Sequence, residues 1–330
     1  MRFVHKPALS AHWYPVAEGA DVGPDPVSIG LLGERFVVWR TDTGVSAAPD
    51  RCPHREAPLS IGHVDAHQVL RCAYHGWGFG ANGVCVDVPS SGGDGPVPPA
   101  AHLPCCSVRE RYGLIWLCPG EPASGIPVIA QDDDPAFRRI NTGIETWTAS
   151  ATRMVDNFLD ISHFPWVHTG TFGSGQPTEV PSIELVDLDD DFHGYAYEVD
   201  AANPQEAAAT TGSTEPVVHR RMSTGFALPL LVRSTIAYED GLEHILLLCS
   251  TPVDDETSLF TFVVWRNDDF SVDAEATIAF DRAIGAEDKT MLEQVRGPLP
   301  LERTALVSVQ ADKPSVEWRR RFLALLDATP

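Results

Sequence analysis

Cysteine and histidine occur together in two short, turn-rich segments of the chain. Cys52 and His54 flank a single proline, and Cys72 and His75 flank an Ala-Tyr pair. Each segment offers one thiolate and one imidazole, so two facing loops supply two sulfur and two nitrogen ligands. Either pair alone is typical of a buried cysteine beside a surface histidine. The presence of both pairs indicates a metal centre.

The spacing of the first pair bears on which metal is bound. Zinc loops usually place paired ligands two to four residues apart, whereas only one residue separates Cys52 from His54. With one intervening residue, Cys52 and His54 could bind the same ion only in a tight chelate. A [2Fe–2S] cluster removes the difficulty, because each loop sends its cysteine to one iron and its histidine to the other. Gly76 and Gly78, beside the second loop, would let backbone N–H groups approach the cluster sulfides.

A second group of ligand-type residues follows at 156–168. Asp160 and His163 are three residues apart, and on the helix predicted at about 150–164 they would share a face. His168 lies five residues beyond His163. We expect Pro165 to break the helix, so that both imidazoles converge on one ion. Two histidines plus one carboxylate form the facial triad of non-haem Fe(II) oxygenases.

The carboxylate of this triad must come from elsewhere, and an amphipathic helix predicted at about 273–296 offers Asp281, Glu287 and Asp288. Asp288 lies four residues from both Ile284 and Leu292, within the apolar stripe. A charged side chain there is costly to bury unless it is paired or bound to metal. We therefore select Asp288 and expect Glu287 to face solvent or to contact the metal ligands from outside.

These segments resemble a known family. The Cys-Pro-His-Arg and Cys-Ala-Tyr-His-Gly-Trp segments are similar to the signature of the Rieske-type non-haem iron oxygenases. Asn157 to His168 resembles their iron-binding segment, Asn-x-x-Asp-x-x-His-x-x-x-x-His. The resemblance is strongest to the vanillate, dicamba and caffeine demethylase branch, and Ala286–Glu293 resembles its third-ligand segment. It implies a [2Fe–2S] cluster on the two Cys/His pairs and Fe(II) on His163, His168 and Asp288. Asp160 would link the two centres, and Asn157 belongs to the same motif.

The fold class predicted for the chain is α+β in two domains. Residues 1–125 are rich in short β-type runs broken by glycine and proline and are predicted to form an all-β Rieske domain. Residues 126–330 are predicted to form the catalytic domain, with an antiparallel sheet and helices, which the family makes helix-grip-like. Further expectations are a hairpin at Asp240-Gly241, a mobile loop at 203–214 and a last helix near 315–327.

Composition narrows the functional classes. With 46 acidic and 24 basic residues the net charge is −22, which disfavours nucleic-acid and membrane-surface binding. No apolar run suggests a signal peptide or a membrane span, so we expect a cytoplasmic chain. Seven cysteines, an odd number, argue against a disulfide framework.

The sequence therefore predicts a terminal oxygenase that uses O₂ to monooxygenate a small organic substrate, with O- or N-demethylation favoured. Ring or aliphatic hydroxylation is the alternative within the family. The family implies a separate ferredoxin or flavin reductase and a homotrimer. Two alternatives belong to other functional classes. A Rieske electron carrier would leave the second group of ligands without a function. A zinc-binding interaction module would use the four Cys/His ligands without any redox role.

Overall fold

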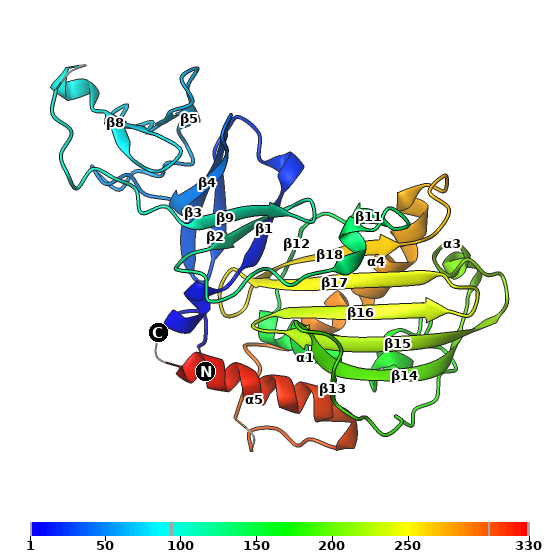
Figure 1. Cartoon of the computed structure of the whole chain (residues 1–330). Helices are drawn as coiled ribbons and strands as arrows, with labels where there is room; N and C mark the ends of the chain where they lie inside the picture. The colour runs from blue at the N-terminus through cyan, green and yellow to red at the C-terminus, as the bar shows by residue number, and fades with distance from the viewer. Residues whose placement is uncertain (1, 93–94, 303, 329–330) are drawn as a thin grey trace. The chain divides into compact units, whose positions relative to one another are not determined.

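The computed structural model describes residues 2–92, 95–302 and 304–328. The chain forms two compact units (Figure 1). The N-terminal unit comprises residues 4–125, and the C-terminal unit comprises residues 126–328 together with residues 2–3.

The N-terminal unit consists of small antiparallel sheets, as expected from short apolar runs separated by turns. Its described residues contain 3-10 turns but no α-helix. The three-stranded sheets are β1 (Tyr14–Glu18), β10 (Leu114–Cys118) and β9 (Ser107–Arg111), and β2 (Val27–Leu31), β3 (Glu34–Thr41) and β4 (Gly44–Pro49). The four-stranded sheet joins β5 (His63–Val64), β6 (Leu70–Arg71), β7 (Gly78–Phe79) and β8 (Cys85–Asp87). The 3-10 turns are η1 (Pro7–Ala11), η2 (Gly19–Asp21) and η3 (Pro89–Ser91).

One apolar core underlies both cysteine–histidine segments of this unit. Val37 and Trp39 of β3 pack with Leu59, Leu70 and Phe79, all of them completely buried. The two cysteines belong to the same core. Each loop is therefore anchored to the core through its buried cysteine, and the close packing of the core limits the movement of the loops.

The C-terminal unit is built on an eight-stranded antiparallel sheet. Its strands are longer, and the Asp240-Gly241 hairpin joins two of them as predicted, with Gly241 at φ +90°. The strand order is β11 (Arg138–Asn141), β18 (Ser258–Arg266), β17 (Glu243–Pro252), β16 (Leu231–Tyr238), β15 (Val217–Ala227), β14 (His193–Ala202) and β13 (Val186–Asp187), with β12 (Glu145–Trp147) also paired to β18.

Helices cover one face of this sheet, where α1 and α4 contact each other (Figure 1). Asp273 caps the start of α4, because its side chain accepts the N–H groups of Glu275 and Ala276. No helix of the described residues is long and apolar enough to cross a membrane. The helices are α1 (Ala151–Leu159), α2 (Phe164–Val167), α3 (Ala208–Thr211), α4 (Ala274–Leu292) and α5 (Lys313–Asp327), with 3-10 turns η4 (Ala130–Asp133), η5 (Gln205–Ala207) and η6 (Gln310–Asp312).

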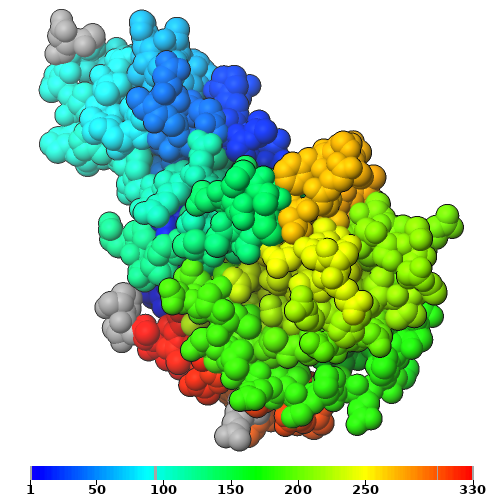
Figure 2. Space-filling model, turned by 45° about the vertical axis from the view of Figure 1, so that its right-hand side comes forward, coloured from blue at the N-terminus to red at the C-terminus, as the bar shows by residue number. Residues whose placement is uncertain are grey.

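Helix α5 closes the sheet unit and begins close to where the sequence predicts the last helix. Trp318, completely buried, donates its indole N–H to the Pro229 carbonyl, and Lys313 donates to the Ile183 carbonyl. In the space-filling view the red residues of α5 lie beside the green residues of the same unit (Figure 2).

The helix predicted at 150–164 ends earlier than expected. Asp160 follows α1 in an extended conformation, and its side chain accepts the Ser162 N–H at 2.8 Å. An aspartate that bonds to the backbone two residues ahead competes with helix continuation. Pro165 does not break this helix; it lies in the first turn of α2, where its missing N–H costs nothing.

Two further expectations are corrected. The segment 203–214, expected to be a loop without regular structure, contains η5 and α3, and Thr210 donates to the Thr277 carbonyl of α4. Polar side chains of the segment, such as those of Asn203 and Thr211, donate hydrogen bonds to backbone carbonyl groups in and next to it. Within the predicted stripe of α4, Ile278 and Leu292 are buried, but Met291 and Val295 are exposed to solvent. The helix ends at Leu292, so Val295 no longer follows its periodicity.

Candidate functional site

The two cysteine–histidine loops have the same backbone design. In each, the cysteine N–H donates to the carbonyl five residues later, at 2.8 Å for Cys52 and 2.9 Å for Cys72. Each cysteine carbonyl accepts the N–H four residues later, from Glu56 or Gly76. Both of those residues have a positive φ, +54° and +70°. Glycine adopts this conformation at little cost at position 76. The Gly76 N–H donates to the Cys72 carbonyl and is therefore not free to approach the cluster sulfides, contrary to the expectation from the sequence.

The donor groups of these loops converge. Cys52 and Cys72 are buried, and burial raises the pKa of the Cys52 thiol to about 11, with Cys72 beside it acting in the same direction. The His54 and His75 ring centroids are 4.4 Å apart. His54 stacks on Trp77, and its Nδ1 is buried without a hydrogen-bond partner.

This donor set fits a [2Fe–2S] cluster. A buried thiol with a raised pKa, such as that of Cys52, needs a cationic metal to hold it as a thiolate. An unpartnered imidazole nitrogen buried beside a second histidine is a ligand-type group. The two thiols lie on the core side, whereas His75 is exposed and His54 half-buried. The histidine edge is therefore the more solvent-exposed side of this donor set.

Asp50 anchors the first loop and was not identified from the sequence. Its fully buried carboxylate accepts both the N–H and the hydroxyl of Ser60, at 2.8 and 2.7 Å. Ser28 and Arg35 donate to it as well. Burial acts to raise the pKa of Asp50, but these donors lower it overall. The one feature of the sequence that could have pointed to Asp50 is its position two residues before Cys52.

The second candidate site brings together three side chains from distant segments. His163 and His168 approach through their Nε2 atoms at 3.1 Å. Asp288, from α4, places Oδ1 at 3.4 Å from each of those nitrogens. These three atoms lie within 4.8 Å of one another. Among the described residues this is the group of His, Cys, Asp or Glu side chains with metal-ligand geometry.

The charge environment of this group fits a divalent cation. Burial acts to lower the pKa of His163, yet hydrogen bonds and charge from Asp160 and Asp288 raise it to about 9. Burial and the neighbouring His163 lower the pKa of His168. The carboxylates thus create a negative field around two imidazole nitrogens. Two imidazoles and one carboxylate are the donor set of non-haem Fe(II) sites.

Three neighbours orient these ligands. Asn157 donates its side-chain N–H to Asp288 Oδ1 at 2.8 Å. Glu287 accepts at 3.0 Å from His168 Nδ1 in the tautomer that leaves Nε2 free for metal. Asp160 Oδ2 lies 3.3 Å from His163 Nδ1, although the two residues do not share a helix.

Glu287 is itself held in place. The hydroxyl of Thr171 donates to Oε2 at 2.7 Å, and the N–H of Gly170 donates to Oε1 at 2.8 Å. The sequence left Glu287 open between a solvent-facing and an outer position, and the structure places it against His168. Thr171 and Gly170 were missed, because nothing in their spacing relates them to α4.

The ligand group borders a cavity of about 140 Å³ between the sheet and helices α1 and α4. Most of its wall is apolar or aromatic, including Phe172, Phe260 and Phe280. Arg220 and Tyr238 add polar groups to the same wall. A concave, mostly apolar space with few polar groups beside a metal site is typical of a small-molecule site.

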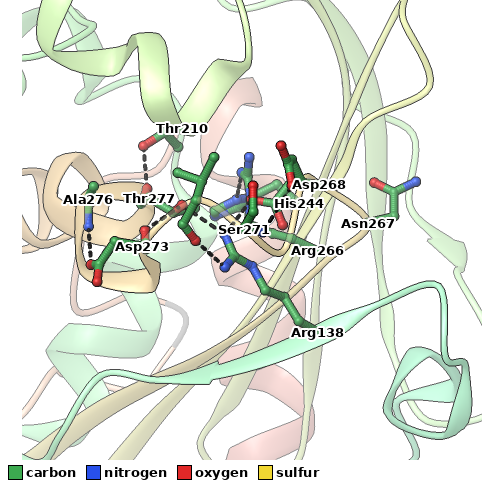
Figure 3. A network of polar contacts seen from close by, with 12 residues as sticks. Arg138, Thr210, His244, Arg266, Asn267, Asp268, Ser271, Asp273, Ala276 and Thr277 are labelled. Carbon is green, nitrogen blue, oxygen red and sulfur yellow. Dashed lines mark hydrogen bonds and ion pairs between the residues drawn. The ribbon is translucent and has the colours of Figure 1, made fainter.

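Asp281, the alternative third ligand, belongs to a different cluster. Its Oδ2 lies 3.1 Å from His244 Nε2, and His244 Nδ1 faces Arg266. Arg266 and Arg138 share the carboxylate of Asp268, at 3.0 and 2.7 Å (Figure 3). Asp281 is therefore engaged away from the two histidines of the candidate iron site.

Two family models match the chain. Residues 12–104 match the Rieske [2Fe-2S] domain. Residues 147–328 match the vanillate O-demethylase oxygenase C-terminal domain.

Characterised relatives match along nearly the whole chain. Methylxanthine N1-demethylase NdmA of Pseudomonas putida is 32% identical, over 97% of this chain and 90% of the relative. Methylxanthine N3-demethylase NdmB of the same species is 29% identical, over 96% and 89%. The dicamba O-demethylase oxygenase component of Stenotrophomonas maltophilia is 36% identical over 47% of this chain and 46% of that protein.

The solved structure of Pseudomonas putida NdmA with caffeine superposes with a TM-score of 0.85 at 28% identity, covering 98% of this chain and 93% of that one. The NdmB structure has a TM-score of 0.81 at 27% identity, over 97% and 92%.

Proposed function

The chain belongs to the Rieske non-haem iron oxygenases with a vanillate O-demethylase type catalytic domain, and we propose that it removes a methyl group from a small organic substrate. It is the terminal oxygenase component, with a Rieske [2Fe–2S] cluster and a mononuclear iron as cofactors. A separate electron-transfer partner is required, as for the oxygenase components among its relatives.

We assign the cluster to Cys52, His54, Cys72 and His75. Matched backbone turns, the two buried thiols and the unpartnered His54 nitrogen support this assignment. The Rieske domain would span residues 1–125. Because the histidines lie at its surface, electrons would enter and leave through the imidazole edge.

We assign the iron to His163, His168 and Asp288, within a catalytic domain of residues 126–330. Their convergence at the edge of the cavity is the observation that carries the proposal. When bound there, iron supplies O₂ activation with electrons delivered from the cluster. Asn157 and Glu287 hold Asp288 and His168 in position, and the aromatic wall excludes water from the substrate.

The proposed reaction inserts one oxygen atom into a C–H bond of a methoxy or N-methyl group. One O₂, two electrons and two protons yield the hydroxymethyl product and one water. The hydroxymethyl group then collapses, releasing formaldehyde and leaving the alcohol or amine. Relatives named as N- and O-demethylases support this outcome over ring hydroxylation.

We also propose a homotrimer, served in the cytoplasm by a ferredoxin or flavin reductase. The seven cysteines form no disulfide among the described residues, as is typical of proteins in reducing compartments. Asp160, at hydrogen-bond distance from His163, would connect the iron site to a cluster histidine of the neighbouring chain.

Metal analysis and turnover test the function together. Purified protein should contain about three irons and two acid-labile sulfides per chain. With a surrogate reductase and NADH, a panel of methoxy- and N-methyl-substituted compounds should give formaldehyde equal to O₂ consumed. Two irons and no O₂ uptake would indicate an electron carrier. Hydroxylated product without formaldehyde would indicate a hydroxylase.

A further inference from the structure

Arg220 is a buried cation in the wall of the cavity. It lies on β15, paired in register with Tyr238 of β16, and is only 5% exposed. Its neighbour Arg221 is exposed, since successive side chains of a strand point to opposite faces. The cavity that Arg220 borders also borders His163, His168 and Asp288.

No carboxylate of the described residues pairs with Arg220. Its Nε is buried without a hydrogen-bond partner. The groups around the guanidinium are the rings of Phe172 and Tyr238, each with its centroid 5.8 Å away. Aromatic faces attract a guanidinium, but they do not replace the hydrogen bonds lost on burial.

The nearby acidic residue of the wall, Asp281, belongs to a separate charge cluster; its Oδ2 lies 3.1 Å from His244 Nε2, and neither atom makes a hydrogen bond within the described residues. In this cluster His244 faces Arg266. The guanidiniums of Arg266 and Arg138 share the single carboxylate of Asp268 (Figure 3). The cluster contains two guanidinium charges and only one carboxylate besides Asp281, so the second guanidinium balances the charge of Asp281. Among the described residues that line the cavity, Arg220 is therefore the cation without a paired carboxylate.

We propose that the substrate is a carboxylic acid whose carboxylate is bound by Arg220; this deepens the proposed function and rests on it. A planar guanidinium matches a carboxylate through two parallel hydrogen bonds, and the pair is strong when buried. A cavity of about 150 Å³ holds benzene, so the observed 140 Å³ suits a single ring. The ring would pack on the aromatic wall while its methyl-bearing group faces His163, His168 and Asp288.

Calorimetric binding without O₂ tests this inference. The probes are 2-, 3- and 4-methoxybenzoate, each beside its benzamide, and 4-methoxybenzylamine as the cationic analogue. We expect at least one benzoate to bind wild-type holoprotein about tenfold more tightly than its amide. Arg220→Gln should abolish that preference by weakening the acid alone, and Arg220→Lys should retain part of it. Arg221→Gln, one residue away on the outer face, should bind like wild type.

The inference is overturned if no benzoate binds wild type more tightly than its amide, or if the amine binds most tightly. It is equally overturned if Arg220→Gln and Arg220→Lys, with wild-type iron content and melting temperature, both keep the preference. Failure of the proposed function is separate, because it would show as missing iron or missing formaldehyde while the binding preference remained.

Discussion

At the scale of single residues, two imidazole nitrogens meet one carboxylate oxygen. Asp288 Oδ1 lies 3.4 Å from the Nε2 atoms of His163 and His168 and also accepts from Asn157. The same oxygen is thus shared by the candidate iron site and its supporting residue. Substitutions here should separate metal binding from folding.

Asp288→Ala should lower the iron content by about one per chain and abolish product, while the visible spectrum of the cluster is retained. The reason is that the triad loses its only anion. Asp281→Asn is the matched control on α4, and it should keep its iron because Asp281 lies against His244. Iron analysis and absorbance spectra decide the matter; normal iron in Asp288→Ala would refute the ligand assignment.

Glu287→Gln should weaken iron binding about tenfold, because a carboxylate that holds a ligand histidine fixes its tautomer and raises its basicity. Competition with a chelator measures the effect directly. Glu275→Gln, at the exposed start of the same helix, provides the comparison. Equal chelator sensitivity in both variants would show that the contact with His168 does not tune the site.

At the scale of elements, two helices bring the site together and a third stabilises the unit around it. Helix α1 ends at Leu159, whose carbonyl accepts the hydroxyl of Tyr195 from β14. Helix α4 presents Glu287 and Asp288 to the segment that follows α1. Helix α5 packs outside them and carries its own ion-pair cluster at Glu317.

Glu317 provides a pH-dependent contribution to stability. Hydrogen bonds from Arg320 and Arg321 lower its pKa to about 2, against the opposing effect of burial. A carboxylate with a depressed folded-state pKa stabilises the protein above its unfolded pKa, and that stability is lost as pH falls towards 2. Glu317→Gln should therefore cost about 1 kcal/mol at pH 7, since the pair is partly solvent-screened.

Urea unfolding of wild type and Glu317→Gln measures this difference. The difference in the free energy of unfolding between the two proteins should be constant between pH 6 and 8 and should decrease below about pH 4.5. A gap that widens on acidification would contradict the assignment. Added salt should also narrow it, because the arginines are exposed or half-buried.

At the scale of the whole molecule, electrons must travel from the N-terminal unit to the iron of the C-terminal unit. The proposed trimer solves this by placing each cluster beside the iron of a neighbouring chain. Asp160 is the candidate connection: burial raises its pKa, but hydrogen bonds with His163 and Ser162 lower it overall, so it remains a carboxylate. An anion next to an iron-ligating histidine can orient it and accept from a second imidazole.

Asp160→Asn should keep both metal centres and the trimer but slow reoxidation of the reduced cluster about 10- to 100-fold. Stopped-flow absorbance in the presence of O₂ and substrate measures the rate. Sedimentation should give the mass of three chains for both proteins. A wild-type rate in the variant, or full activity from a proven monomer, would exclude the bridging role.

Local spacing carried most of the information about the chemistry. The patterns that matter are short: two closely spaced Cys/His pairs and an Asp-x-x-His-x-x-x-x-His segment. They can therefore be recognised in the sequence without a structure. The class of enzyme and both cofactors followed from them, whereas the α+β fold was predicted separately from the order of strand-like and helix-like segments. The Asp240-Gly241 hairpin was predictable for the same reason, because turn chemistry is local.

Only the tertiary structure decided which distant groups meet. Glu287 and His168 are 119 residues apart, so no spacing rule joins them. Helix α1 ends at an aspartate turn rather than at Pro165, and the histidine group depends on the path of the chain after that turn. Arg220 is one of two adjacent arginines, and strand alternation predicts that one points inward. That it borders the cavity without a counterion depends on how β15 packs beneath the helices, because burial and ion pairing are properties of the assembled core.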